Sequence, residues 1–116
     1  MNLESQLAQF TGTENYYRFS PINPNLVMTD GVKYLAEKAE CFWLLDIIAS
    51  LDYVPSCRNQ PFMTCRFKKE GDAGTFTADN GNKKVLYTQE IPYTDFPIDS
   101  VSVYVIDGVV LLPSEY

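Results

Sequence analysis

Histidine is absent from the chain, and its three cysteines include no C-x-x-C pair. Without histidine, a His-ligated metal site, a Ser-His pair and a Cys-His pair are all excluded. The odd number of thiols (Cys41, Cys57 and Cys65) and the lack of an N-terminal signal peptide predict a reducing, cytoplasmic setting. We expect Cys57 to be the exposed thiol, with a pKa lowered slightly by Arg58, but it has no neighbouring base or resolving thiol.

Long apolar runs and positive charges are also scarce. No apolar run reaches the ~20 residues that span a bilayer. Nine Lys and Arg stand against fifteen Asp and Glu, which gives a net charge of −6 and a pI near 4.4. This balance disfavours direct binding to nucleic acid or to an acidic membrane surface. No nucleotide, metal or catalytic motif occurs, so we expect no cofactor.

The chain does contain enough apolar material for one core. Its 116 residues are 46% hydrophobic and 21% charged, which is the composition of a single globular domain over residues 1–116. The least polar stretch, residues 36–53, predicts a long helix at the centre of that core. Between Cys41 and Leu51 only Asp46 and Ser50 are polar, so a helix places both on one narrow stripe and buries the rest.

Residues 26–35 allow two interpretations. Asp30 and Gly31 form either a two-residue hairpin turn between strands at 26–29 and 32–35, or the start of the long helix. The hairpin is slightly favoured, because a helix that begins at Asp30 lacks the Glu or Gln of a capping box three residues later. Upstream, residues 3–10 predict a short amphipathic helix.

The second half of the chain predicts strands over 62–69, 75–78, 83–91, 101–106 and 109–112. The first of them alternates apolar and polar residues, which is typical of a half-buried strand. Asn80-Gly81 predicts a tight turn that sets Phe76 opposite Val85. The face that covers the helix then carries four apolar side chains: Met63, Phe67, Phe76 and Val85.

The last hairpin, with its turn at Asp107-Gly108, is apolar on both faces and therefore needs cover on both. Either the N-terminal segment covers the second face, or that face is a dimer or partner interface. The first face carries Val101, Val103, Val105, Val110 and Leu112, and the second carries Tyr104, Ile106, Val109 and Leu111.

Two polar groups are candidates for chemistry. Asp46 lies beside Trp43, and a carboxylate among apolar neighbours suits acid–base catalysis, although contact with solvent explains it more simply. Arg66, Lys68 and Lys84 form a small basic patch on the outer face of the predicted sheet. Such a patch suits a phosphate or an acidic partner, although an ordinary solvated face explains it as well.

The loop before the last hairpin is a candidate for partner binding. An exposed Phe96 between Asp95 and Asp99 has the character of an interface anchor. A turn built on Pro92 and Pro97 explains the same residues with fewer assumptions.

Four stretches resemble a small, uncharacterised family of bacterial, plasmid and phage proteins, and they cover most of the chain. They are LAQFTGTENYYRF (7–19), MTDGVKYLAEKAECFWLLDIIAS (28–50), DNGNKKVLYTQEIPYTDFPID (79–99) and VVLLPSEY (109–116). The family supplies no catalytic residues. Where it has a small residue in the middle of LAEKAECFW, this chain has Glu40, which argues against a helix break there. The resemblance implies a setting of phages and mobile elements, in which small acidic proteins often inhibit host defence complexes.

Together these features predict an α+β fold, an antiparallel meander of about five strands packed on one long buried helix, plus a short N-terminal helix. The expected function is that of a small acidic, non-enzymatic interaction protein with a protein partner, such as an anti-CRISPR-like inhibitor of a host defence complex. A carboxylate-dependent enzyme and a structural homo-oligomer subunit, such as a homodimer, are the alternatives. We expect no direct contact with nucleic acid or with a membrane.

Overall fold

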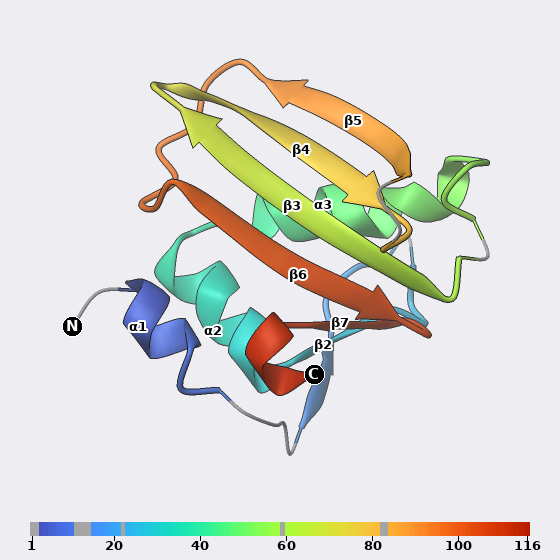
Figure 1. Cartoon of the computed structure of the whole chain (residues 1–116). Coiled ribbons are helices and arrows are strands. Elements are labelled where there is room, and N and C mark those ends of the chain that lie inside the picture. Colours follow the sequence, from blue (N-terminus) through green and yellow to red (C-terminus); the bar gives the residue numbers. More distant parts are fainter. Residues whose placement is uncertain (1–2, 11–14, 22, 59, 82–83) are drawn as a thin grey trace.

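Seven strands form one mixed sheet with short helices packed against it in the computed structural model (Figure 1). The structure describes residues 3–10, 15–21, 23–58, 60–81 and 84–116. The strands are β1 (Tyr16–Arg18), β2 (Val27–Thr29), β3 (Phe62–Glu70), β4 (Ala73–Asp79), β5 (Val85–Ile91), β6 (Ser100–Ile106) and β7 (Val109–Leu111). The helices are α1 (Leu3–Leu7), α2 (Asp30–Lys38) and α3 (Phe42–Ser50), with 3-10 turns η1 (Leu51–Tyr53) and η2 (Pro113–Glu115).

The strand order, β1-β2-β7-β6-β3-β4-β5, shows that the predicted five-strand antiparallel meander is wrong. β3, β4 and β5 are consecutive neighbours, but the chain then crosses back and places β6 on the other side of β3. β2 pairs in parallel with β7, and β1 pairs antiparallel with β2. β6 is apolar on both faces, and a position between β3 and β7 gives it a neighbour at each edge.

The predicted long helix is two nine-residue helices, α2 and α3. Glu40 lies between them with φ of 52°, a left-handed conformation that ends a helix. The helix therefore breaks at Glu40, the residue that was expected to favour a continuous helix. The Asp30-Gly31 hairpin is also wrong, because β2 ends at Thr29, which caps α2 by accepting a hydrogen bond from the Val32 N–H.

The carboxylate that the local sequence lacks at the start of α2 comes from the C-terminal segment. Glu115 accepts hydrogen bonds from the Thr29 hydroxyl (2.6 Å), the Gly31 N–H (3.2 Å) and the Leu112 N–H (3.0 Å). A negative charge at a helix N-terminus is stabilising. A Cβ at Gly31 would lie 2.6 Å from the Leu112 side chain, so glycine is what allows η2 to dock this closely.

The predicted two-residue turn at Asn80-Gly81 is wrong, because β4 ends at Asp79 and β5 begins only at Val85, so the loop between them is longer. Phe76 pairs with Gln89, four residues beyond the predicted Val85. An even shift keeps the predicted alternation of faces along β5. Val85 is the exception, because it is 57% exposed. Residue 83, the predicted start of this strand, lies outside the described residues.

The final hairpin has the predicted two-residue turn. Asp107 and Gly108 both have positive φ, 49° and 84°, as a type I′ turn requires, and Ile106 pairs with Val109. The inner face of the hairpin is buried as predicted, at Val101, Val103, Val105, Val110 and Leu112.

α3 packs against the inner face of the sheet, where Figure 1 shows it behind β3 and β4. Its opposite side is open, since Phe42 is 46% exposed and Trp43 and Ile47 are half-buried. No helix in the described ranges combines the length and the apolar content of a bilayer-crossing segment. The buried side of α3 consists of Leu44, Leu45, Ile48 and Ala49.

We expect Gly74→Ala to destabilise the protein, because the ring of Phe67 lies directly over Gly74. A Cβ there would be 2.3 Å from Phe67 Cζ, and overpacking of this kind costs about 1–3 kcal/mol. Urea unfolding measures the cost. The substitution should cost clearly less in a Phe67→Leu background, and an equal cost in both backgrounds would contradict the close packing.

Candidate functional site

An open cleft of about 470 Å³ runs between α3 and the β5 edge of the sheet. Two of its lining residues come from α3, two from β5 and three from the loop that follows β5. Hydrophobic walls with a few placed polar groups are the usual composition of a binding site. The lining residues are Trp43, Ile47, Gln89, Ile91, Tyr93, Thr94 and Asp95.

Three aromatic rings pack against one another at the base of the cleft and form its aromatic floor. The Trp43 ring lies edge-on to Phe67 and Phe96, with ring centroids 5.1 Å and 6.5 Å away, and the Phe67 and Phe96 centroids are 5.4 Å apart. Edge-to-face packing of this kind is favourable beyond the area it buries. Phe67 and Phe96 are fully buried, whereas Trp43 is half-buried and lines the cleft.

Hydrogen bonds to the backbone fix the loop that follows β5. The Thr94 N–H donates to a carbonyl of the β3–β4 turn (2.7 Å), and the Thr94 hydroxyl accepts from the Phe96 N–H (3.2 Å). Lys69 Nζ donates to the Phe96 carbonyl (2.9 Å). Thr94 and Phe96 are buried, so the loop directs Tyr93 (72% exposed) and Asp95 outward, where they form the rim.

β5 is the last strand of the sheet, and within the described residues β4 is its only neighbour. Ser56 Oγ donates to the Leu86 carbonyl (2.7 Å), so that carbonyl points away from β4. A β-bulge at Leu86 interrupts the alternation of backbone directions there, so the direction of the later groups follows from the rest of the sheet. The Lys69 N–H donates to the Asp99 carbonyl beside β6, so Arg66, of opposite parity in β3, directs its backbone groups to its partner Thr77 in β4. Thr77 therefore turns its backbone groups away from β5, and those of its partner Thr88, and of Glu90, point away from β4. The edge is thus covered at Leu86 and presents backbone groups farther along, beside the cleft.

The two segments that line the cleft carry charge of one sign. Residues 39–57 and 85–116 contain eight of the fifteen acidic residues and none of the nine Lys and Arg. Carboxylates of one sign around a cleft with apolar walls focus the electric field there and attract cations.

The predicted interface residues of the last hairpin lie on the outer face of the sheet. The Tyr104 ring centroid is 5.3 Å from that of Phe62 and 5.4 Å from that of Tyr116, so the C-terminal residue lies against this face. Helix α1 packs against α2, where Tyr34 donates a hydrogen bond to Gln6 (2.9 Å), and its last residue, Leu7, accepts one through its carbonyl from Ser114 of η2 (3.3 Å). All four predicted residues are half-buried: Tyr104, Ile106, Val109 and Leu111.

Of the three loop residues predicted for partner binding, only Asp95 lines the cleft. Phe96 is 1% exposed, and the prediction of an exposed ring is wrong because the aromatic floor gives that ring apolar neighbours. Asp99 is exposed, and its backbone carbonyl accepts a hydrogen bond from the Lys69 N–H (2.7 Å).

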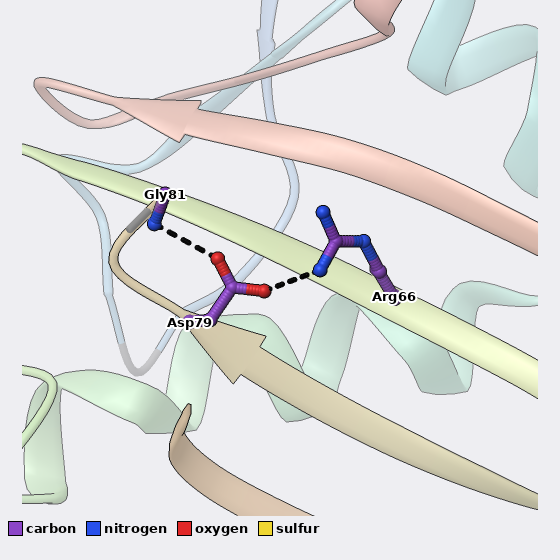
Figure 2. Close-up of polar contacts among 3 residues, drawn as sticks. All are labelled: Arg66, Asp79 and Gly81. Carbon is purple, nitrogen blue, oxygen red and sulfur yellow. Dashed lines mark hydrogen bonds and ion pairs between the residues drawn. The ribbon is translucent and has the colours of Figure 1, made fainter. Parts of the chain in front are cut away.

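The predicted basic patch is largely neutralised. Figure 2 shows the Asp79 carboxylate between two donors, Arg66 Nη1 at 2.5 Å and the Gly81 N–H at 2.8 Å. Asp79 is 4% exposed, so these two donors take the place of the water that burial removes. Lys68 makes an exposed ion pair within β3 (3.8 Å), and Lys84 is exposed. Asp79 therefore ties β3 to β4 and to the turn after it, and it leaves little free positive charge for an anion.

Asp46, the carboxylate weighed as a candidate for acid–base catalysis, is in an open position, in line with the simpler expectation of contact with solvent. Asp46 is exposed on α3 and does not line the cleft, so it lacks the enclosed environment in which an acid or base acts on a bound substrate. In the part of the chain that the structure describes, no group of three or more Cys, Asp or Glu is placed to hold a metal ion.

All three cysteines are free and buried, which corrects the expected exposure of Cys57. Burial raises the pKa of Cys57, whereas the prediction was a small decrease caused by Arg58. Burial also raises the pKa of Cys41 and of Cys65, each to about 12. Protonated thiols in a core are poor nucleophiles.

Sequence reasoning missed most of the cleft. Trp43 and Ile47 were assigned to the buried surface of a long helix, and Tyr93 to a turn. One signal in the sequence does point there, namely that no Lys or Arg occurs after Lys84. A negative charge confined to particular segments indicates a surface with a preferred sign of partner.

The chain belongs to a family of unknown function, DUF6876, whose sequence profile matches residues 1–116. The predicted resemblance to a family without assigned function is thereby confirmed, while its bacterial, plasmid and phage setting stays a prediction. No curated protein and no solved structure matches the chain. Function must therefore be argued from the residues of the site.

Two buried thiols should make the protein sensitive to alkali. Their folded-state pKa of about 12 lies above the ordinary value of 9.0, so their neutral form stabilises the fold below pH 9 and that contribution is lost as the pH rises toward 12. Each thiol then loses up to about 1.4 kcal/mol per pH unit. We expect urea unfolding between pH 8 and 10.5 to show a steeper decline for the wild type than for Cys65→Ala. Parallel declines would contradict the buried thiol.

Proposed function

We propose that the protein is a non-enzymatic interaction module that binds an extended segment of a protein partner along the open edge of β5. The observation that carries the proposal is the position of the cleft, which lies between α3 and that edge. A peptide that adds a strand to a sheet gains affinity from backbone hydrogen bonds, and pockets for alternate side chains give it specificity.

The geometry of β5 suits such a strand. The backbone groups of Thr88 and Glu90 point away from β4, and the side chains of Gln89 and Ile91, between and after them, line the cleft. An added strand would lie ~4.8 Å from β5, and every second side chain on it would point toward α3. There Trp43 and Ile47 supply apolar contact area.

The edge is only partly protected. Natural edge strands carry Lys or Pro, contain a β-bulge, are covered by other segments, or are very short. β5 has seven residues, Val85–Ile91, and contains neither Lys nor Pro, whereas β1 at the other edge has three residues. Its bulge and the contact with Ser56 both lie at Leu86, before the residues beside the cleft. An edge that is left open beside a cleft is explained if it pairs with a partner there.

As the biological setting we propose inhibition of a host defence complex by a protein of a phage or another mobile element. The family resemblance and the net charge of −6 support this setting. The test is plaque counting on bacteria that carry a defined defence system and express the chain. The proposal predicts that plaques return for at least one system, and unchanged protection against every system tried would contradict it.

Thr88→Pro should abolish peptide binding without unfolding the protein. Proline removes the N–H that points away from β4 and leaves the β4–β5 ladder intact. We expect peptides selected from a displayed random library to bind the wild type and to lose at least about tenfold in affinity on Thr88→Pro, since a buried partner carbonyl would be left unpaired.

Thr88→Ala is the matched control, because it changes only a side chain on the outer face and keeps the N–H. Thermal unfolding of both variants checks that the fold persists. Equal binding by the wild type and a folded Thr88→Pro variant would rule out strand addition at β5.

A further inference from the structure

We infer that the segment bound at the cleft is basic, with a large apolar side chain flanked by Lys or Arg. This inference rests on the proposed function and names the chemistry of the partner. Shape alone would accept an extended segment of either charge. The distribution of charge around the cleft selects between them.

All seven lining residues come from the two segments without Lys or Arg, residues 39–57 and 85–116. The rest of the chain contains seven acidic residues and all nine basic ones. The segments that form the cleft are thus acidic and the rest of the chain is slightly basic, although two of the eight carboxylates, Asp107 and Glu115, lie away from the cleft at the β6–β7 turn and at the start of α2. A partner segment that approaches the cleft meets a negative field, which speeds the encounter if the segment is positive.

Three carboxylates are placed to meet a bound strand. Asp95 is at the rim. Asp46 lies on the exposed surface of α3, within one turn of both lining residues of that helix. Glu90 is exposed on β5 itself, with its backbone groups toward the added strand and its side chain on the outer face of the sheet, where it would meet the outward-facing side chains of that strand. None of the three forms an ion pair with a described cation.

The cations elsewhere in the described chain are largely engaged. Arg66 pairs with the buried Asp79, and Lys33 pairs with Glu37 one helical turn away. The carboxylates at the cleft therefore have no internal counter-charge, and a basic partner would supply it.

A second copy of the chain is a poor occupant for the same reason. Antiparallel pairing of two β5 strands would bring together two copies of the same acidic segment, residues 85–116, which contains no Lys or Arg to pair with its carboxylates. Like charges that face each other across an interface weaken it. An acidic or neutral partner segment would leave the carboxylates of the cleft unpaired.

The single tryptophan, Trp43, lines the cleft, so its fluorescence reports binding there directly. The probes are three capped seven-residue peptides with the same apolar positions, KVKLKVK, QVQLQVQ and EVELEVE. We expect the basic peptide to bind on the order of tenfold more tightly than the acidic one, with an advantage that shrinks as salt is added.

Charge variants locate the effect. Asp46→Asn and Asp95→Asn should each weaken the basic peptide about two- to fivefold, as for an exposed ion pair, and leave the neutral peptide unchanged. Asp107→Asn is the matched control, because it removes the same charge at the distant β6–β7 turn, where Asn also tolerates the positive φ.

The outcomes separate the two claims. An acidic peptide that binds as tightly as the basic one, in a manner that Thr88→Pro abolishes, overturns the basic partner and leaves strand addition in place. Equal loss of affinity in Asp107→Asn and Asp95→Asn also overturns it, because the effect of removing a charge would then not depend on whether that charge lies at the cleft. Failure of all three peptides and of library peptides to bind in a Thr88-dependent manner overturns the proposed function and this inference with it.

Discussion

The contact among Trp43, Phe67 and Phe96 is the interaction on which the rest of the structure depends. It joins α3, β3 and the loop between β5 and β6, three segments far apart in the sequence. Phe96 is held in the core at the point where the chain passes the β3–β4 turn, between β5 and the start of β6 on the far side of β3. The same anchor holds Tyr93 and Asp95 at the rim, so the crossover that sets the topology also builds one wall of the cleft.

Two sides of the molecule differ in packing and charge, and they have different roles. The C-terminal segment closes the fold, because Glu115 supplies the carboxylate at the start of α2 that the nearby sequence lacks. The opposite side, between α3 and β5, keeps a half-buried Trp43, an exposed Tyr93 and a strand edge beside them. A fold selected only for stability would cover such an edge or place Lys on it. That contrast supports a binding role for this side of the protein.

Local patterns in the sequence predicted local structure, but they did not predict contacts between segments that are far apart in the chain. The turn at Asp107-Gly108 and the alternation of buried residues in β6 depend on neighbours in the chain, so both were predictable. The crossover was not, because period-two alternation does not identify the neighbour of a strand. The helix break at Glu40 had no local signal, because neither Gly nor Pro lies between Ala36 and Tyr53. The cleft was not predicted for a similar reason, since the burial of Phe96 and the half-exposure of Trp43 depend on tertiary contacts.

The account can be tested at its centre by two-dimensional NMR of the aromatic side chains in the intact protein. Cross-relaxation between ring protons reports pairs within about 5 Å, and edge-to-face rings of this kind bring their protons that close. The account predicts cross-peaks from the Trp43 indole to both Phe67 and Phe96, and from Phe67 to Phe96. A Phe96 ring that is exposed to solvent and gives no cross-peak to Trp43 or Phe67 would contradict the described crossover, the rim and the cleft together.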